Sequence, residues 1–281
     1  MAGQHRGRVN RASTADRIPL VPGVVPATGR RDARGVAGEG LLGQFLAWIV
    51  PSTCAGCGSP RTGAGGAGAC PACWASIPEL DPARGCPGCA LPGPGGTCRA
   101  CRRSPSPLEQ AAAFGAYEGT LKRLIGAYKF RGFDLLAAPF AERLVRLARR
   151  SGLAARADAL VAVPSTGRRN RERGFDPAPL LAREAARRLA VPLLRPLRRS
   201  RATPPQSTLS RSARLVNVAG AFEARAYVAG RSLLLVDDIV TTGATAFAAA
   251  AALRRSGASH VDLLVLARTL APEEKRPSES A

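Results

Sequence analysis

The stretch Leu233-Leu234-Leu235-Val236-Asp237-Asp238-Ile239-Val240-Thr241-Thr242-Gly243-Ala244-Thr245 decides the fold of this chain. It begins as a continuous apolar run, which is typical of a parallel strand buried on both faces. Two adjacent carboxylates follow, then a short hydroxylated loop and an Ala-rich helix over 244–255. Backbone N–H groups and the helix dipole at such a loop attract an anion, and Gly243 lets the backbone come close. Paired carboxylates suit sugar hydroxyls or a hydrated Mg²⁺, so the stretch predicts a site for a phosphorylated sugar at a strand's carboxyl end.

This stretch closely resembles the phosphoribosyl pyrophosphate (PRPP) motif of type I phosphoribosyltransferases. The resemblance implies that Asp237 and Asp238 hold the ribose 2′- and 3′-hydroxyls. It also implies that the following residues hold the 5′-phosphate, namely Thr241, Thr242, Gly243, Ala244 and Thr245. The competing interpretation is an ordinary strand followed by a capped helix. Two acids at the end of a buried strand favour a site, because buried charges need partners.

Strands and helices alternate through the second half of the chain. Apolar runs predict strands over 111–117, 159–163, 232–236 and 260–266. Apolar residues at helical spacing predict helices over 119–130 and 135–149, and Asp176-Pro177 marks the start of a helix that continues to residue 189. This alternation argues for a parallel sheet with right-handed crossovers.

All eight cysteines lie in four C-x-x-C knuckles, separated by 12, 12 and 8 residues. This spacing is the signature of zinc ribbons, in which two knuckles supply one tetrahedral Cys₄ site. Pairing in sequence predicts one Zn²⁺ site from Cys54, Cys57, Cys70 and Cys73 and a second from Cys86, Cys89, Cys98 and Cys101. An interleaved pairing is the main alternative, and an Fe–S cluster or redox dithiols are others. Four thiolates leave no open position for a substrate, so a structural or docking role is favoured over a catalytic one.

Two Arg-rich segments carry further candidate ligands. Residues 163–176 follow a predicted strand and hold four Arg within six positions, which suggests a pyrophosphate clamp; a solvated basic loop is the alternative. The residues assigned to this anion loop are Ser165, Thr166, Gly167, Arg168, Arg169 and Arg173. Residues 195–222 lack an apolar period and acids, and predict a flexible hood over the ligand. Its candidate contacts are Gln206, Arg211, Arg214 and Asn217.

Four features occur in a fixed order: the knuckles, Val163-Pro164 with 169–175, the segment 206–218 with Phe222, and the stretch 236–245. In this combination the chain resembles the ComF/GntX family of competence proteins over roughly residues 45–270. The resemblance implies a type I phosphoribosyltransferase fold with zinc knuckles and, in competent bacteria, a role in DNA uptake. One departure stands out, because the family's R-G-F-N-Q reads Arg173-Gly174-Phe175-Asp176-Pro177 here. Asp176 cannot donate an amide hydrogen bond, and we expect it to cap the helix instead.

Composition bounds the class of partner and the compartment. The formal net charge is +21, almost all of it from Arg, and a basic excess of this size suggests polyanionic ligands; codon bias towards Arg is the competing explanation. We expect no membrane span and no secretory signal, because no apolar segment is long enough for either. The expected compartment is therefore the cytoplasm, where thiols stay reduced.

The predicted fold class is α/β, a type I phosphoribosyltransferase-like parallel sheet flanked by helices with a small N-terminal zinc-ribbon module. The expected divisions are a disordered basic segment over 1–40, a double zinc ribbon over 41–105, a phosphoribosyltransferase-like domain over 106–270 and a polar tail over 271–281. The leading hypothesis is a protein that binds PRPP with Mg²⁺, transfers phosphoribose to an unidentified acceptor and is linked to DNA uptake; no catalytic residue is identified. The alternative is a non-catalytic accessory protein on the same scaffold that handles single-stranded DNA.

Overall fold

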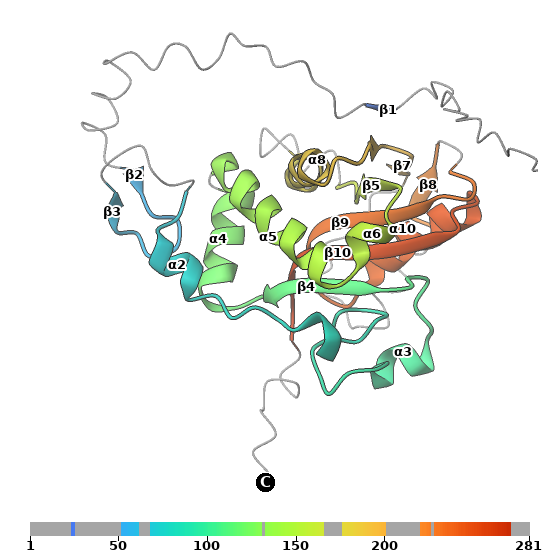
Figure 1. Cartoon of the computed structure of the whole chain (residues 1–281), viewed down its shortest axis with the longest axis horizontal. Helices are drawn as coiled ribbons and strands as arrows, with labels where there is room; N and C mark the ends of the chain where they lie inside the picture. Colours follow the sequence, from blue (N-terminus) through green and yellow to red (C-terminus); the bar gives the residue numbers. More distant parts are fainter. Residues whose placement is uncertain are drawn as a thin grey trace, which may run out of the picture.

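The computed structural model describes residues 24–25, 52–61, 68–130, 133–165, 176–200, 220–225 and 228–270. Within this part, six strands form one sheet in the order β1-β6-β5-β9-β10-β4 (Figure 1). The strands are β1 (Val24–Val25), β4 (Ala111–Ala116), β5 (Ala159–Ala162), β6 (Leu193–Leu194), β9 (Ser232–Val240) and β10 (His260–Arg268). All neighbours are parallel except β1, which pairs antiparallel with β6. The predicted α/β class with a parallel sheet is therefore confirmed.

Helices cover both faces of the sheet. One face packs against α4 (Gly119–Phe130), α5 (Ala137–Arg150) and α8 (Pro177–Leu189), and the other against α10 (Ala244–Arg255). Side chains of β9 alternate accordingly, since Leu234 and Val236 belong to the first core and Leu233 and Leu235 to the second. The short helices η2 (Asp134–Leu136) and α6 (Leu153–Arg156) flank α5. No helix in the described ranges has the length and apolar character needed to cross a bilayer.

The predicted helices agree with the structure, and two strands run further than the sequence indicated. β9 continues to Val240 and β10 to Arg268, because Asp237 pairs in register with Val265 and Val240 with Arg268. The two acids thus lie within β9, where hydrogen bonds to β10 extend the strand beyond its apolar run. Asp176 is the N-cap residue of α8, as expected, although its side chain makes no capping hydrogen bond.

The strand order places a topological switch point between β5 and β9. The crossover from β5 through α8 leads to β6 on one side, whereas the crossover from β9 through α10 leads to β10 on the other. Open α/β sheets bind ligands at such a switch point, outside the carboxyl ends of the two strands. The carboxyl end of β9 carries Asp237 and Asp238, so the fold places them at this position.

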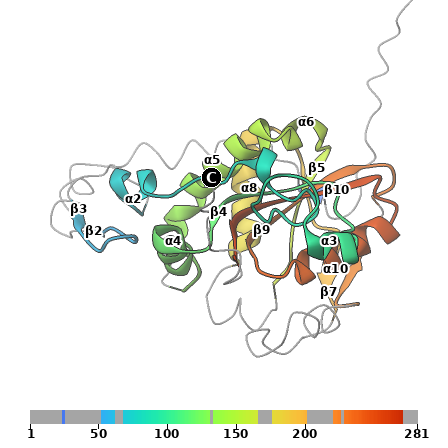
Figure 2. The ribbon, with the colours of Figure 1, turned by 90° about the horizontal axis from the view of Figure 1, so that it is seen from below.

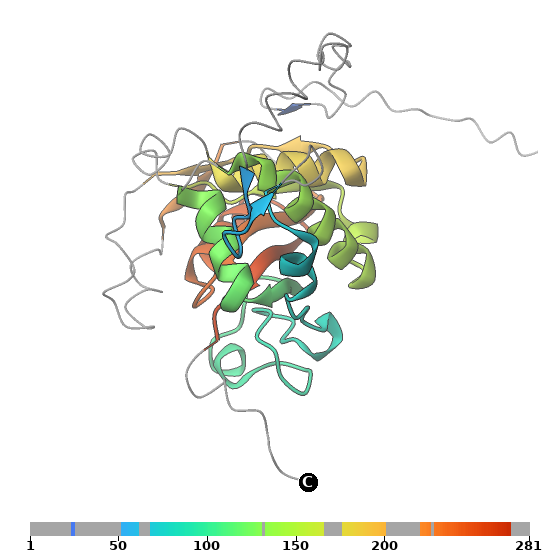
Figure 3. The ribbon, with the colours of Figure 1, turned by 90° about the vertical axis from the view of Figure 1, so that its left-hand side faces the viewer.

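The eight cysteines form two separate groups on the domain. The first cysteine cluster consists of Cys54, Cys57, Cys70 and Cys73. Its segment of the chain also forms β2 (Ser52–Thr53), β3 (Pro60–Arg61) and α2 (Pro71–Ala75), and it lies beside α4 and α5 (Figure 3). The second cysteine cluster consists of Cys86, Cys89, Cys98 and Cys101. Its segment of the chain also forms η1 (Pro82–Arg84) and α3 (Arg99–Arg103), and it lies beside α10 (Figure 2). The two clusters therefore contact different parts of the domain.

The segment between the two clusters runs along the outer edge of β4. Leu80 N–H donates to the Phe114 carbonyl at 2.9 Å, and Glu79 forms an antiparallel bridge with Gly115. The outer edge of β4 is thereby paired at Phe114 and Gly115.

The predicted flexible hood contains regular structure at its base. β7 (Leu197–Arg199) pairs antiparallel with β8 (Phe222–Ala224), and Phe222 is buried. Strands of three residues leave no periodic signal in the sequence, so they were missed. The four candidate contacts Gln206, Arg211, Arg214 and Asn217 lie outside the described residues.

Candidate phosphoribosyl site

Two carboxylates at the end of β9 face opposite sides of the sheet. Asp238 follows the side of Leu234 and Val236, is only 7% exposed, and pairs with Lys129 of α4 at 2.7 Å between Nζ and Oδ1. Asp237 points to the side of α10, and one of its oxygens accepts the backbone N–H of Asp238 at 2.8 Å. The lysine is thus the cation nearest to the acidic pair among the contacts of the described residues.

Helix packing holds Lys129 in place. The neighbouring Tyr128 is fully buried, and its hydroxyl donates to the Pro177 carbonyl at the start of α8 at 2.7 Å. This bond fixes α4 against α8, and α8 itself lies over β5 and β9. The packed helices α4 and α8, rather than a loop, therefore place Lys129 beside Asp238.

Asp237 has a strongly perturbed acidity. Burial raises the pKa of its carboxyl to about 8, and the neighbouring charge of Asp238 adds to the increase. Lys129 and the backbone N–H of Asp238 act in the opposite direction and only partly offset it. At neutral pH this carboxyl mostly carries a proton, so a ligand that requires the anion must displace that proton.

The loop after β9 has a backbone that demands glycine. Gly243 is the N-cap of α10 with φ of +86°, and a Cβ at this position would lie 2.8 Å from Cζ of Phe247. Thr242 Oγ1 accepts the N–H of Ala244 at 3.4 Å, and the Gly243 carbonyl accepts the N–H of Phe247 at 2.8 Å. The first-turn amides of α10 therefore point out of the helix towards the carboxyl edge of the sheet.

Substituting Gly243 by Ala is expected to lower the melting temperature by about 5–15 °C. The left-handed backbone costs roughly 1–2 kcal/mol for Ala, and overlap with Phe247 adds about 1–3 kcal/mol. Gly230→Ala is the matched control, because Gly230 also has positive φ (+68°) but open space around its Cβ position. Scanning calorimetry measures both variants. Equal losses in the two would contradict the role assigned to Phe247.

The remaining predicted ligands divide into those the structure describes and those it does not. Thr241 is exposed, Thr242 and Thr245 are half-buried and Ala244 is buried, all around the start of α10. Ser165 lies just beyond β5, where Val163 N–H donates to the Val236 carbonyl at 3.0 Å. The two strand ends are thereby brought together. Thr166, Gly167, Arg168, Arg169 and Arg173 lie outside the described residues.

One residue at the site was missed by the sequence reasoning. Arg268 ends β10, is only 2% exposed, and donates from Nη1 to the carbonyls of Thr241 and of Thr269, the latter at 2.5 Å. Its Nε donates to the Cys89 carbonyl at 3.0 Å. A charged residue ending a buried apolar strand needs buried partners, and that was the available signal.

Each cysteine cluster has the dimensions of a tetrahedral metal site. The four sulfurs in each group lie within 4.8 Å of one another, and the structure pairs the knuckles in sequence. Individual Sγ–Sγ distances are 3.7 Å for Cys54–Cys73, 3.9 Å for Cys57–Cys70 and 3.7 Å for Cys89–Cys98. A Zn–S bond of about 2.3 Å gives tetrahedral edges of about 3.8 Å, so the thiols fit Zn²⁺.

Backbone N–H groups donate to two of these sulfurs. Cys70 N–H donates to Cys54 Sγ at 3.2 Å, and Cys98 N–H donates to Cys86 Sγ at 3.3 Å. Burial opposes ionisation of Cys54, but backbone N–H groups of Cys57, Cys70 and Gly56 outweigh it and lower its pKa to about 6. Burial instead raises the pKa of Cys73 to about 12 and that of Cys89 to about 11, so a divalent cation would displace protons from these two ligands on binding.

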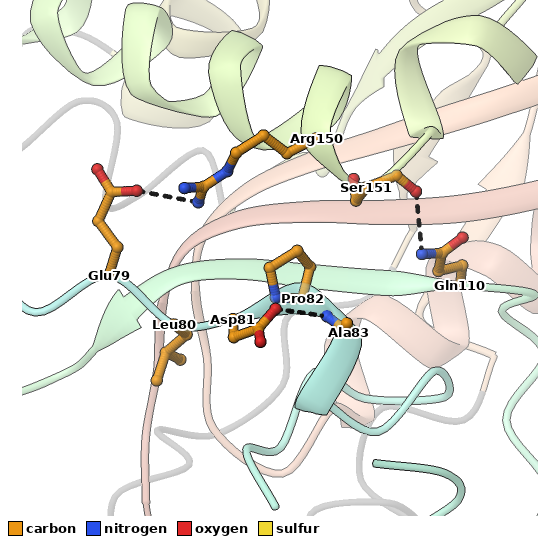
Figure 4. A pocket seen from close by; sticks show the side chains of 8 residues that line it. All are labelled: Glu79, Leu80, Asp81, Pro82, Ala83, Gln110, Arg150 and Ser151. Carbon is orange, nitrogen blue, oxygen red and sulfur yellow. Dashed lines mark hydrogen bonds and ion pairs between the residues drawn. The ribbon is translucent and has the colours of Figure 1, made fainter.

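A pocket of about 490 Å³ lies elsewhere, beyond the outer edge of β4 (Figure 4). Its lining includes Glu79 and Arg150, which form an ion pair at 2.9 Å, and Gln110, which donates to the Ser151 carbonyl. β10 and β4 separate this pocket from β9. The pocket is therefore distinct from the site of Asp237 and Asp238.

Comparisons with known proteins agree with this geometry. The family Phosphoribosyl transferase domain matches residues 174–279. DNA utilization protein YhgH of Salmonella typhi is 35% identical over 191 residues, which are 66% of this chain and 84% of the relative, and YhgH of Escherichia coli K12 matches to the same extent. Competence protein F of Haemophilus influenzae is 29% identical over 61% of this chain and 78% of its own length.

A solved structure, UMP synthase of Leishmania donovani, matches at 22% identity over 53% of this chain and 24% of that one. Its TM-score of 0.27 is too low to support an argument. The similarity to the sequence relatives is much stronger evidence than this structural match. Their identity across most of their length, together with the phosphoribosyltransferase match and the four knuckles, shows that the chain belongs to the ComF/GntX family.

Proposed function

We propose that this protein binds PRPP with Mg²⁺ at the carboxyl ends of β5 and β9 and transfers the phosphoribosyl group to a nucleophilic acceptor. The observation that carries the proposal is the meeting of Asp237 and Asp238 with the glycine-capped start of α10 at the switch point of the sheet. An acidic pair that can accept hydrogen bonds from a diol lies next to a helix start that attracts a phosphate, which matches a ligand carrying both groups. The match to phosphoribosyltransferases over residues 174–279 supports the same ligand.

Each group has a distinct role in this proposal. The carboxylates of Asp237 and Asp238 accept hydrogen bonds from the ribose 2′- and 3′-hydroxyls, and the backbone amides of 241–245 donate to the 5′-phosphate. Lys129, now paired with Asp238, supplies a cation beside the leaving group. Mg²⁺ is a hard cation that suits carboxylate and phosphate oxygens, and when bound it neutralises charge on pyrophosphate.

Transfer itself breaks the bond between ribose C1 and pyrophosphate, and pyrophosphate keeps the electron pair. An acceptor nitrogen donates its lone pair to C1 and loses its proton to solvent. The protein contributes positioning and electrostatic stabilisation, because the attacking nucleophile belongs to the acceptor. The Arg-rich loop of Arg168, Arg169 and Arg173 remains the predicted partner of pyrophosphate.

We also propose that both cysteine clusters hold Zn²⁺ and that the protein serves DNA uptake or utilisation in a reducing cytoplasm. The sulfur spacings support zinc, all eight thiols are free, and the names of the relatives suggest the process. The net charge of +21 favours a second function, the binding of single-stranded DNA phosphates. Affinity for DNA would fall steeply with salt, whereas PRPP binding would require Mg²⁺.

Calorimetric titration of the zinc-loaded protein tests the PRPP site. Mg·PRPP is expected to bind in the micromolar range, and ribose 5-phosphate and Mg·pyrophosphate, which each offer half of the ligand, should bind at least about tenfold more weakly. Omitting Mg²⁺ is preferable to chelation, because a chelator would also attack the cysteine clusters. A folded protein that gives no heat with Mg·PRPP would refute the proposed function.

Binding of PRPP is expected to strengthen with pH, by nearly tenfold per unit below about pH 8, and then to level off. The folded protein keeps Asp237 protonated up to that range, and the ligand needs its anion. The same shift makes folding less favourable as pH rises from 3.8 to about 8. Titrations in buffers of different ionisation enthalpy should show release of close to one proton at neutral pH. Asp237→Asn should bind weakly without this slope, and a pH-independent wild type would contradict the assignment.

A further inference from the structure

Arg268 joins three segments of the chain that are far apart in sequence. Its guanidinium is buried and donates to carbonyls of Cys89 in the second cysteine cluster, of Thr241 in the loop after β9, and of Thr269. A guanidinium is planar and rigid, so moving one of these carbonyls disturbs the bonds to the others. The three carbonyls accept hydrogen bonds from Nε and Nη1 of a side chain that is only 2% exposed, as a buried charge requires.

Phe247 makes a second connection between the same two places. Its ring lies against Gly243, at the distance that excludes a Cβ there. The ring also packs against the buried group of Cys86, Cys89, Leu91 and Cys101. The second cysteine cluster and the loop 241–243 thus share one polar and one apolar neighbour.

We propose that the second cysteine cluster, when it holds metal, fixes the loop 241–243 through Arg268, which is a positioning residue for anion binding. The four thiols of this cluster would hold the metal, which would tie the Cys86–Cys89 knuckle to the Cys98–Cys101 knuckle and so keep the Cys89 carbonyl where it accepts the hydrogen bond of Arg268 Nε. The other side of the same guanidinium holds the Thr241 carbonyl and so the entry to α10. This proposal rests on the proposed PRPP site, and adds that the site depends on a metal it does not contact.

The first cysteine cluster serves as the internal comparison. It packs against α4 and α5, where Arg123 Nε donates to the Gly56 carbonyl at 2.6 Å and Trp74 stacks edge-on to Phe140. Loss of its metal should loosen those helices. The second cluster forms its own small buried group beside the loop, so its effect should be local.

Hydrogen exchange of the full chain tests the coupling without any ligand. Cys98→Ser removes one thiol from the second cluster and Cys57→Ser one from the first, and both thiols are at least partly exposed. Amides of 241–246 are expected to exchange about tenfold faster in Cys98→Ser and at the wild-type rate in Cys57→Ser. Unchanged exchange in Cys98→Ser, with zinc content confirming loss of one metal, would overturn the proposal.

Substitution of Arg268 tests the connecting residue. Arg268→Met is expected to weaken Mg·PRPP about tenfold and to speed zinc release to a chromogenic chelator. Because coupling is reciprocal, Mg·PRPP should slow zinc release in wild type and not in this variant. Arg156→Met is the control, since Arg156 pairs at 3.0 Å with Asp262 at the other end of β10.

Arg268→Lys separates bridging from charge. An ammonium keeps the charge but cannot span the two carbonyls as the forked guanidinium does, so this variant should behave like Arg268→Met. Wild-type affinity and zinc release in Arg268→Lys would overturn the proposal. If wild type fails to bind Mg·PRPP, the proposed function fails, while the exchange and ligand-free zinc-release experiments still decide the coupling.

Discussion

Asp237→Asn together with Asp238→Asn is expected to weaken Mg·PRPP binding by at least about 100-fold. Each carboxylate would accept a charge-assisted hydrogen bond from a ribose hydroxyl, worth about 1.5–3 kcal/mol, and two such bonds exceed the 2.7 kcal/mol or so that 100-fold requires. Calorimetry at about pH 8, where Asp237 is substantially ionised, gives the largest contrast.

The single variants should differ in stability. Asp237 is already mostly protonated at neutral pH, so Asn in its place should leave the melting temperature unchanged or raise it. Asp238→Asn leaves the half-buried ammonium of Lys129 without its carboxylate and should be destabilising. Asp262→Asn provides the control, because Asp262 is equally buried on the neighbouring strand and should not affect PRPP. If the double variant bound Mg·PRPP with wild-type affinity, the assignment of these two carboxylates to the PRPP site would be contradicted.

Loss of metal from the first cysteine cluster is expected to lower the melting temperature by about 6–20 °C. Cys54, Cys73 and Ile77 belong to the same buried core as Leu124 and Phe140 of α4 and α5. Cys73→Ser therefore opens the main core, at a cost of at least about 3–5 kcal/mol, and each kcal/mol is worth about 2–4 °C at this size. The second cluster touches less of the core, and Cys101→Ser should lower the melting temperature by only a few degrees.

Two measurements check this difference between the clusters. Elemental analysis should give two zinc ions for wild type and one for each variant. Trp74 reports on the first cluster, because it stacks on Phe140 and lies 3.6 Å below the guanidinium carbon of Arg143. Its fluorescence should shift in Cys73→Ser and not in Cys101→Ser. A larger destabilisation from Cys101→Ser would contradict the assignment of the first cluster to the core.

The fold was predictable because its signals are local. The apolar run before Asp237, the Ala-rich helix after Gly243 and the alternation of strands and helices each occupy a short window of sequence. The acidic pair and the loop belong to that same window, which is why they could be selected together. The cysteine pairing was predictable as well, since knuckles that are close in sequence form the two groups.

Other features depend on contacts between distant residues. Nothing near Arg268 in the sequence indicates that it reaches Cys89, 179 residues away. The two cysteine clusters are separated by a segment that pairs with β4 at Glu79 and Leu80, and this pairing uses backbone groups that side chains do not encode. Asp176 shows the reverse case, in which a local signal for a side-chain cap was correct in position and wrong in mechanism.

The segment along the outer edge of β4 is held at both ends by cysteines, Cys73 before it and Cys86 after it. If either metal leaves, this cover is tethered at one end only and can peel away from β4. An uncovered parallel sheet then offers a row of free amides and carbonyls to the next molecule, which is the usual start of aggregation. If both clusters hold zinc, as proposed, zinc starvation is expected to promote aggregation through this edge.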